Sequence, residues 1–335
     1  MVTGRPATQR DVALRAGVST ATVSYIMSGR RDRRTPVSGD TRQRVLDAAR
    51  ALGYQRNHAA RSLRRRKSEL VCVVYQPPLN PWIEQLIEQV QVAAAGRGYS
   101  MILLPAAAGV PANRVLREQF VDGAIVVGER DRLPELPELA AHGLALVVLD
   151  DDMKPEGFDV VRRNRHVACR SGVEHLLASG HRRIAYLAHP QDETTSNRVR
   201  YAAYAEALKA QRIPIDESIV TIESDMDASP YQLTKALFDR DDRPTALFSA
   251  SDRGAIEAMW ALRDLGLSVP QDVAVVGVGN VRQGKAVRPS LTTVGDPGMD
   301  FSAAIDCLFR RIDQPDMKPQ VIERPWKLII RESAP

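Results

Sequence analysis

The sequence predicts an α/β protein in which an N-terminal three-helix helix-turn-helix headpiece precedes a two-lobed, doubly wound parallel-sheet domain. Three observations predict this arrangement. The chain has 335 residues, which is too long for one typical domain. Residues 1–67 carry a formal net charge of +12, whereas residues 68–335 carry −7. From residue 70 onward, short apolar runs alternate with segments of helical periodicity, as expected for a parallel sheet that helices cover on both faces.

The basic module has the pattern of three short helices. Thr8 is a favourable N-cap for a first helix that ends at Gly17, and Ser19 is a favourable N-cap for a second. A third helix is expected from about residue 38 to residue 53. Two short helices joined by a glycine-containing turn form a helix-turn-helix, whose second helix inserts its N-terminal side chains into the major groove of DNA. Those side chains are Ser19, Thr20, Ala21, Thr22 and Tyr25.

Two alternatives exist for the basic module. A three-helix bundle without a ligand would not need so strong a positive charge. A solubilising tail would lack the apolar periodicity that this segment has. Both features together therefore favour a DNA-binding module.

The acidic body shows two series of strand and helix signals, which predict two lobes. The first series has expected strands at residues 70–75, 100–104, 123–127 and 145–149, with helices at 82–96 and 112–119. The second series has expected helices at residues 169–180, 198–211, 231–238 and 254–265, with strands at 184–188, 219–222, 246–249 and 273–277. Ligands of doubly wound sheets bind outside the carboxyl ends of the strands. The cleft between the lobes is therefore the expected small-molecule site.

Motifs in both parts resemble those of the lac-repressor (LacI/GalR) family. The headpiece motifs are residues 8–13, 16–19, 21–24, 37–38, 41–42, 45–46, 52–54 and Asn57. The body motifs are residues 175–176, 180–185, 243–246, 265–266, 269–270, 272–273, 289–294 and 330–333. The resemblance implies a periplasmic-binding-protein-like sensor domain and a transcriptional regulator that acts as a repressor. It also implies a homodimer that binds near-palindromic double-stranded operator DNA and whose operator affinity is set by a small-molecule effector.

The resemblance further implies where the parts begin and end. The headpiece is expected at residues 1–55, a hinge helix or linker at 56–68, and the effector-binding and dimerisation domain at 69–335. Three crossovers between the lobes are expected near residues 162–168, 293–297 and 323–327. They divide the domain into an N-lobe (about 69–163 and 297–323) and a C-lobe (about 164–294 and 326–335).

The hinge segment is expected to take part in DNA binding. Its arginines repel one another until DNA phosphates neutralise them. By resemblance, the segment orders as a helix on operator DNA and Leu63 wedges into the minor groove; the alternative is a plain basic linker. The full set of expected DNA contacts is Thr8, Ser19, Thr20, Ala21, Thr22, Tyr25, Arg30, Asn57, His58, Ala60, Leu63 and Arg64. The family usually has arginine where Tyr25 stands, so its operator preference does not carry over.

Positions that match the family's effector contacts lie at the ends of expected strands and at the crossovers. They are Asn80, Trp82, Asp150, Arg163, Arg198, Ser251, Asp252, Gly279 and Asn280. Gly279 and Arg163 depart from the family, which usually has carboxylates there; Asn280 or Asp296 could take over the lost role. A sugar or sugar derivative is the first hypothesis for the effector. An anionic or other non-sugar metabolite is the alternative, and a cleft that binds no ligand is the third.

Patterns of enzymes, metal sites and membrane proteins fail at identifiable positions. Residues 279–286 fit a phosphate-binding loop until Ala286, where Mg²⁺ needs a hydroxyl group, and Pro289 is expected to leave no room for the following helix. The histidines lack metal-ligand spacing, so no catalytic residue, cofactor or metal is expected. The cysteines lack paired spacing and are expected to be reduced, and neither a secretory signal nor a transmembrane run is visible.

These features predict a cytoplasmic protein without enzymatic activity and without a membrane partner. The alternative class is a solute-binding receptor that does not bind DNA. Such a receptor would need an export signal and would have no use for the basic headpiece.

Overall fold

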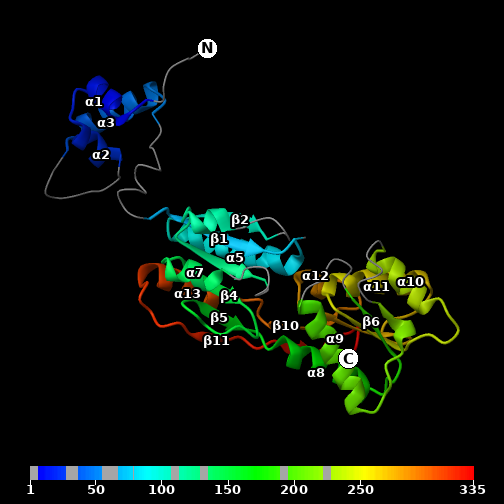
Figure 1. Ribbon diagram of the computed structural model, residues 1–335. Coiled ribbons are helices and arrows are strands. Elements are labelled where there is room, and N and C mark those ends of the chain that lie inside the picture. Colours follow the sequence, from blue (N-terminus) through cyan, green and yellow to red (C-terminus); the bar gives the residue numbers. More distant parts are fainter. Residues whose placement is uncertain are drawn as a thin grey trace. The chain divides into compact units, whose positions relative to one another are not determined.

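The computed structural model of the protein (Figure 1) describes residues 7–27, 37–54, 67–77, 79–106, 113–128, 135–188, 195–221 and 228–335. The chain divides into two compact units, residues 1–66 and residues 67–335. No helix of the described part of the chain is both long enough and apolar enough to cross a membrane.

The first unit contains the three expected helices, α1 (Gln9–Ala16), α2 (Thr20–Met27) and α3 (Gly39–Ala51). Thr8 and Asp11 form a capping box at the start of α1, and Gly17 ends this helix with a left-handed φ of 66°. The helices meet in a small core whose buried members are Val12, Ala13, Ala16, Val23, Ile26, Val45, Ala48 and Ala49. The predicted helix-turn-helix headpiece is therefore confirmed.

Among the described residues, the second unit holds two six-stranded sheets, one in each lobe. The lobe 1 sheet has the order β11-β5-β4-β3-β1-β2 and its neighbours pair in parallel. Its strands are β1 (Leu70–Tyr75), β2 (Ser100–Pro105), β3 (Gly123–Val127), β4 (Ala145–Leu149), β5 (Asp159–Arg162) and β11 (Val321–Glu323). The lobe 2 sheet has the order β12-β10-β9-β8-β6-β7, with β12 antiparallel to β10. Its strands are β6 (Ile184–Leu187), β7 (Val220–Thr221), β8 (Ala246–Ser249), β9 (Ala274–Val278), β10 (Thr292–Gly295) and β12 (Lys327–Ile329).

Helices cover both faces of the lobe 1 sheet. Successive residues of β1 alternate between two cores, because Val71 and Val73 join one and Cys72 and Val74 the other. Helices α5 (Pro81–Gly96) and α13 (Ser302–Asp313) supply residues to the first core. Helices α6 (Asn113–Arg117) and α7 (Leu136–Ala141) supply residues to the second. This double coverage explains why the strands are continuously apolar in sequence.

Lobe 2 is built in the same way. Helices α8 (Arg165–Ala178) and α9 (Thr195–Ala210) pack on one face of its sheet, and α10 (Pro230–Phe238) and α11 (Asp252–Asp264) on the other. A 3₁₀ turn (Glu217–Ile219) precedes β7, and the short α12 (Arg282–Ala286) follows β9. The predicted two-lobed, doubly wound α/β body is confirmed.

The segment after β9 forms a short helix that the sequence analysis did not predict. Pro289 is expected to leave no room for the helix of a phosphate-binding loop, and the helix that does form after β9, α12, has five residues and ends before this proline. Its N-cap residue, Val281, has no side-chain oxygen and makes no capping hydrogen bond. The short helix α12 therefore resembles a single turn more than the long helix of a phosphate-binding loop.

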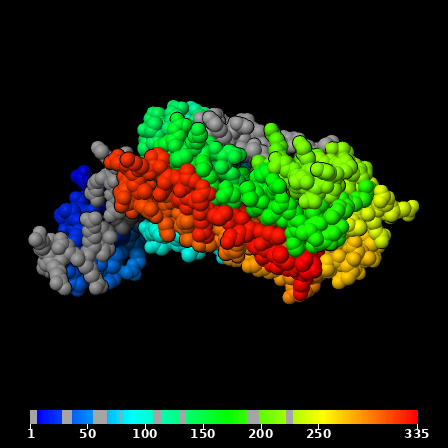
Figure 2. Space-filling model, turned by 90° about the horizontal axis from the view of Figure 1, so that it is seen from below, coloured from blue at the N-terminus to red at the C-terminus, as the bar shows by residue number. Residues whose placement is uncertain are grey.

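Three crossovers connect the lobes. The first crossover (residues 163–164) joins β5 to α8, the second (296–301) joins β10 to α13, and the third (324–326) joins β11 to β12. The main chains of the first and third crossovers are bonded together, since Arg324 N donates to Arg162 O at 2.8 Å and Trp326 N donates to Arg163 O at 2.8 Å. Figure 2 shows the segment after α13, in red, running along one face from lobe 1 to lobe 2.

Candidate DNA-binding surface and effector cavity

The start of α2 presents a small polar surface. Thr20 and Ala21 are exposed there, whereas Ser19 caps the helix by accepting a hydrogen bond from Thr22 N at 3.1 Å. The hydroxyl groups of Ser19 and Thr22 also lie within hydrogen-bond distance, at 2.9 Å. Tyr25 is partly buried against the headpiece core. The first turn of α2 therefore exposes the side chains of Thr20 and Ala21, and the cap at Ser19 holds the backbone of this turn in place.

The other expected DNA contacts are less informative. Thr8 is exposed but caps α1, and its hydroxyl donates to Asp11 Oδ2 at 2.7 Å. Arg30, Asn57, His58, Ala60, Leu63 and Arg64 lie outside the described residues. The hinge hypothesis therefore stays a prediction.

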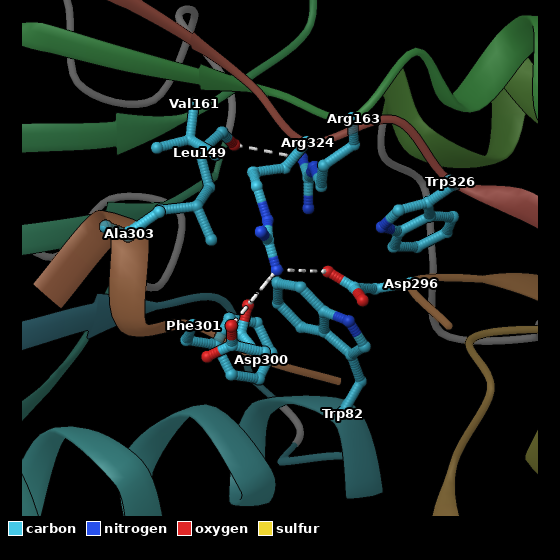
Figure 3. A pocket seen from close by; sticks show the side chains of 11 residues that line it. Trp82, Leu149, Val161, Arg163, Asp296, Asp300, Phe301, Ala303, Arg324 and Trp326 are labelled. Carbon is cyan, nitrogen blue, oxygen red and sulfur yellow. Dashed lines mark hydrogen bonds and ion pairs between the residues drawn. The ribbon is translucent and has the colours of Figure 1, made fainter. Parts of the chain in front are cut away.

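In the second unit, residues of lobe 1 and of all three crossovers line a narrow, partly open cavity whose free space, about 20 Å³, has room for about one water molecule (Figure 3). We call it the crossover cavity. Its lining residues are Trp82, Leu149, Val161, Arg163, Asp296, Asp300, Phe301, Ala303, Ala304, Arg324 and Trp326. The cavity lies where β4 and β5 end, next to the N-terminal ends of α5 and α13. This is the edge at which ligands of doubly wound sheets bind.

Aromatic rings form much of the wall of the crossover cavity. The ring of Trp82 meets Phe301 edge-on with centroids 5.0 Å apart, and the centroid of Trp326 lies 6.3 Å from that of Trp82. The guanidinium group of Arg163 lies 5.4 Å from the Trp82 ring centroid and 5.8 Å from the Trp326 ring centroid. Such distances are within the range of cation–π attraction.

Arg163 is buried, and neighbouring groups largely compensate its positive charge. Its Nη2 donates to Leu149 O at 2.9 Å, and its Nε lies 3.9 Å from Asp151 Oδ1. Arg165 Nε donates to the other carboxylate oxygen of Asp151 at 2.6 Å. Burial alone would raise the pKa of Asp151, but the two guanidinium groups outweigh it and lower this pKa to about 2. Asp151, which sequence reasoning missed, thus offsets the positive charge expected from Arg163.

Burial lowers the pKa of Arg163 to about 9, so the side chain remains a cation at neutral pH. Two buried nitrogen donors at the crossover cavity, Nε of Arg163 and Nε1 of Trp82, have no hydrogen-bond partner among the described residues. Unpaired buried donors are costly, which makes the cavity a place where an acceptor atom of a ligand would be favourable.

Arg324 connects the third crossover to the second. Its Nη2 lies 3.2 Å from Asp300 Oδ2 and 3.6 Å from Asp296 Oδ2, and it donates to Asp300 O at 3.3 Å. The backbone and side-chain donors of Ser302 hold the pKa of Asp300 below its usual value, and Arg324 adds to this effect. The arginines of the lining are therefore each matched by carboxylates, so that the crossover cavity has no large excess of either charge.

The lobe 2 residues expected at the effector site are placed elsewhere. Asp252 is 1% exposed, and its carboxylate accepts hydrogen bonds from the Thr293 hydroxyl and from Val281 N at 2.8 Å. Asn280 is also 1% exposed, donates to Asp296 O at 2.6 Å and accepts from Arg331. Burial raises the pKa of Asp252 to about 6 despite these hydrogen bonds. Neither residue lines the crossover cavity.

Gly279 and Ser251 lie next to Asp252 and do not line the crossover cavity. A Cβ atom on Gly279, whose φ is 136°, would lie 3.6 Å from Asp252 Oδ2, and Ser251 caps α11 by accepting from Gly254 N at 3.0 Å. We call Asp252, Asn280, Val281 and Thr293 the lobe 2 network. Its hydrogen bonds join three elements, which are α11, β10 and the loop that follows β9.

Three further expected contacts also lie away from the lining. Asn80 caps α5 by accepting from the backbone of Trp82 at 3.1 Å, and Asp150 accepts from Met153 N at 2.7 Å. Arg198 is exposed on α9. Of the expected effector contacts, the structure thus brings Trp82 and Arg163 together. The other polar and aromatic residues of the lining are Asp296, Asp300, Phe301, Arg324 and Trp326.

The signal for the missed residues was present in the sequence. Tryptophan is rare in this chain, and Trp326 stands on a segment that was expected to cross between the lobes. An aromatic ring beside a crossover is a reasonable candidate for the wall of a cleft. Among the described residues, no group of three or more histidine, cysteine, aspartate or glutamate side chains is suited to hold a metal ion.

A basic helix-turn-helix unit combined with a two-lobed domain and a cavity at its crossovers defines a class: a DNA-binding transcriptional regulator with a small-molecule sensor domain. Comparisons with known proteins agree. Residues 8–57 match the family described as bacterial regulatory proteins, lacI family, and residues 173–334 match a periplasmic binding protein-like domain. The HTH-type transcriptional repressor PurR of Edwardsiella ictaluri is 31% identical over 98% of this chain and 96% of its own length.

Solved structures give the same result. The lac repressor dimer bound to operator and the anti-inducer ONPF is 26% identical, with a TM-score of 0.77 over 98% of this chain and 99% of that one. A transcriptional regulator CelR–cellobiose complex is 29% identical, with a TM-score of 0.66 over 98% of this chain and 100% of that one. The chain belongs to the lacI family of bacterial regulatory proteins. It is a DNA-binding repressor regulated by effector binding, and not an enzyme.

Proposed function

We propose that the effector is a neutral sugar or sugar derivative and that it binds at the crossover cavity, beside Trp82 and Trp326, in a form of the protein in which this narrow cavity has widened. The observation that carries the proposal is the combination of aromatic walls with arginine and carboxylate groups that neutralise one another. Aromatic faces favour the apolar faces of a ring, and a few fixed polar groups orient its hydroxyl groups. The cellobiose complex of a 29% identical regulator supports the same ligand class.

An anionic metabolite is the second candidate. The Nε of Arg163 favours it, because this atom makes no hydrogen bond and a carboxylate or phosphate oxygen would accept one from it. Asp151 opposes it, because this carboxylate already neutralises much of the local positive charge. The balance of these charges favours the neutral ligand.

Calorimetric titration with a panel of neutral sugars and a panel of organic acids and sugar phosphates tests the proposal. We expect a neutral sugar to bind and Trp82→Ala to abolish its binding. Trp260→Ala is the matched control, because Trp260 is 47% exposed on α11 and is not part of the lining. Binding that is confined to the anionic panel would overturn the sugar assignment, and sugar binding that survives Trp82→Ala would place the ligand elsewhere.

We also propose that the first turn of α2 contacts operator bases and that the protein binds a near-palindromic operator as a homodimer. A single headpiece covers only a few base pairs, so that two headpieces related by a two-fold axis are needed for affinity. Selection of bound sequences from random DNA gives the site. Thr20 and Ala21 variants should then change the preferred sequence, whereas changes limited to overall affinity would contradict base contact.

Two measurements extend this test. Light scattering should give a dimer, and a monomer that still binds one operator tightly would contradict the homodimer. Leu63→Ala should weaken specific binding and reduce DNA bending, whereas Arg64→Ala should weaken binding to all sequences more evenly. Unchanged bending in Leu63→Ala would leave the hinge segment as a linker.

A further inference from the structure

The two tryptophan rings of the crossover cavity form a V-shaped notch. Their planes are tilted by 60° and their centroids are 6.3 Å apart. The guanidinium group of Arg163 lies beside both rings, at nearly equal distances of 5.4 Å and 5.8 Å from the two centroids. We call this feature the tryptophan notch (Figure 3).

We propose that the tryptophan notch is an organic-cation site that the chain fills with its own side chain. Arg163 then acts as an internal ligand that holds the first and third crossovers against α5. The three parts come from different elements: Trp82 from the first turn of α5, Arg163 from the first crossover and Trp326 from the third. This inference concerns how the crossovers are held together in the absence of effector, and it does not depend on the identity of the effector.

The burial and bonding of Arg163 support a ligand role over simple packing. The side chain is 7% exposed, and a cation is removed from water only where fixed groups replace its hydration. Leu149 O and Asp151 supply part of that replacement at the end of β4. The rings supply the rest, because the negative face of an indole attracts a cation most strongly where water is excluded.

The position of Arg163 also explains how filling the notch would stabilise the contact between the first and third crossovers. The backbone oxygen of Arg163 accepts the hydrogen bond from Trp326 N, so the same two residues are joined through main chain and side chain. The rotation of one crossover against the other would have to break both contacts. An empty notch should leave only the main-chain bond between these residues.

The notch can be emptied without removing its anchor. In Arg163→Ala, Asp151 keeps its ion pair with Arg165, at 2.6 Å, and so does not become an unpaired buried charge. Trp260→Phe provides a background in which Trp82 and Trp326 are the two remaining tryptophans and report directly on the notch. Arg253→Ala is the control, because Arg253 is exposed on α11, pairs with Glu257 and does not line the cavity.

The experiment is a titration of these full-length variants with ethylguanidinium chloride, with sodium chloride at equal ionic strength as the reference. In Arg163→Ala we expect a shifted tryptophan emission and a lower Tm. Both should return toward the wild-type values in a saturable way, with a dissociation constant on the order of 1 mM. Hydrogen exchange at Trp326 N–H should be faster in Arg163→Ala and should slow again with ethylguanidinium. Wild type and Arg253→Ala should show no saturable response.

A second pair of variants covers the case in which Arg163→Ala does not fold. Arg163→Lys keeps the charge and Arg163→Met keeps an apolar side chain of similar length. A cation site predicts that the lysine variant has the higher Tm, whereas a packing role predicts that the methionine variant is at least as stable. A methionine variant that matches or exceeds the lysine variant, or an Arg163→Ala protein without a saturable response to ethylguanidinium, would overturn the proposal.

Discussion

The crossover cavity and the lobe 2 network contain similar polar side chains in opposite circumstances. In the lobe 2 network, Asp252 is fully buried and both of its carboxylate oxygens accept hydrogen bonds from the chain. In the crossover cavity, Arg324 and its carboxylate partners are partly exposed, and Nε1 of Trp82 and Nε of Arg163 have no hydrogen-bond partner among the described residues. The difference separates polar groups that serve the fold from polar groups that are free to serve a ligand.

The variant with the largest expected effect removes a donor from the lobe 2 network. Thr293→Val is nearly isosteric and leaves the buried carboxylate of Asp252 with one hydrogen bond fewer. Because hydrogen bonds to charged groups are strong and an unsatisfied buried group adds a penalty, we expect a loss of about 3 kcal/mol in unfolding free energy at neutral pH. Urea denaturation measures it. A loss below about 1 kcal/mol would mean that the network is not a structural core.

The next effect is a pH dependence of stability. Because burial raises the pKa of Asp252 from 3.8 to about 6, the unfolded chain releases this proton at lower pH than the folded protein does. This group therefore stabilises the fold least above pH 6, and its contribution is lost as pH rises from about 4 through about 6. Asp252→Asn has no such titration. Between pH 4.5 and 7.5, wild type should lose about 2 kcal/mol more than this variant.

Urea denaturation at both pH values provides the comparison, with the exposed Asp306→Asn as the control for a general loss of charge. Parallel pH profiles of wild type and Asp252→Asn would contradict the raised pKa of Asp252. The Thr293→Val variant sharpens the same test, because the loss of a hydrogen bond to the carboxylate should enlarge the fall in stability.

The smallest effect is expected in the crossover cavity. Arg324→Gln removes partly exposed ion pairs with Asp296 and Asp300, so we expect it to cost less than about 1 kcal/mol. Its effect should instead appear in ligand titrations, since Arg324 is part of the lining. A destabilisation as large as that of Thr293→Val would remove the contrast between the two regions.

The sequence predicted the fold well because its signals were local. Caps at Thr8 and Ser19, the turn at Gly17 and continuous apolar strands are each readable from a few neighbouring residues. Short elements such as β5 and α7 were missed, since they are too brief to show a clear period. The crossovers were anticipated through the family resemblance rather than through local pattern.

The candidate site was only partly predictable because its charges are matched over long distances along the chain. Arg163 suggested a positive cleft, but Asp151 neutralises it through a contact that depends on how the loop after β4 folds back. Asp252 fitted a ligand position, yet Thr293, far along the chain, turns it inward. Tertiary packing decides which polar groups bond to other groups of the chain and which stay available to a ligand. Matching single positions to a family does not contain that information.

The position of α13 and β11 late in the chain has a consequence for biosynthesis. Because the ribosome releases the chain from its N-terminus, the headpiece core is complete once residues up to 54 have emerged. When β10 has emerged, lobe 1 still lacks α13, whose Ile305, Cys307 and Leu308 cover one face of its sheet, and lobe 2 still lacks β12. Neither lobe can close its core in the order of synthesis, so the nascent protein carries a folded DNA-binding unit beside two unfinished sheets that present apolar surface to chaperones.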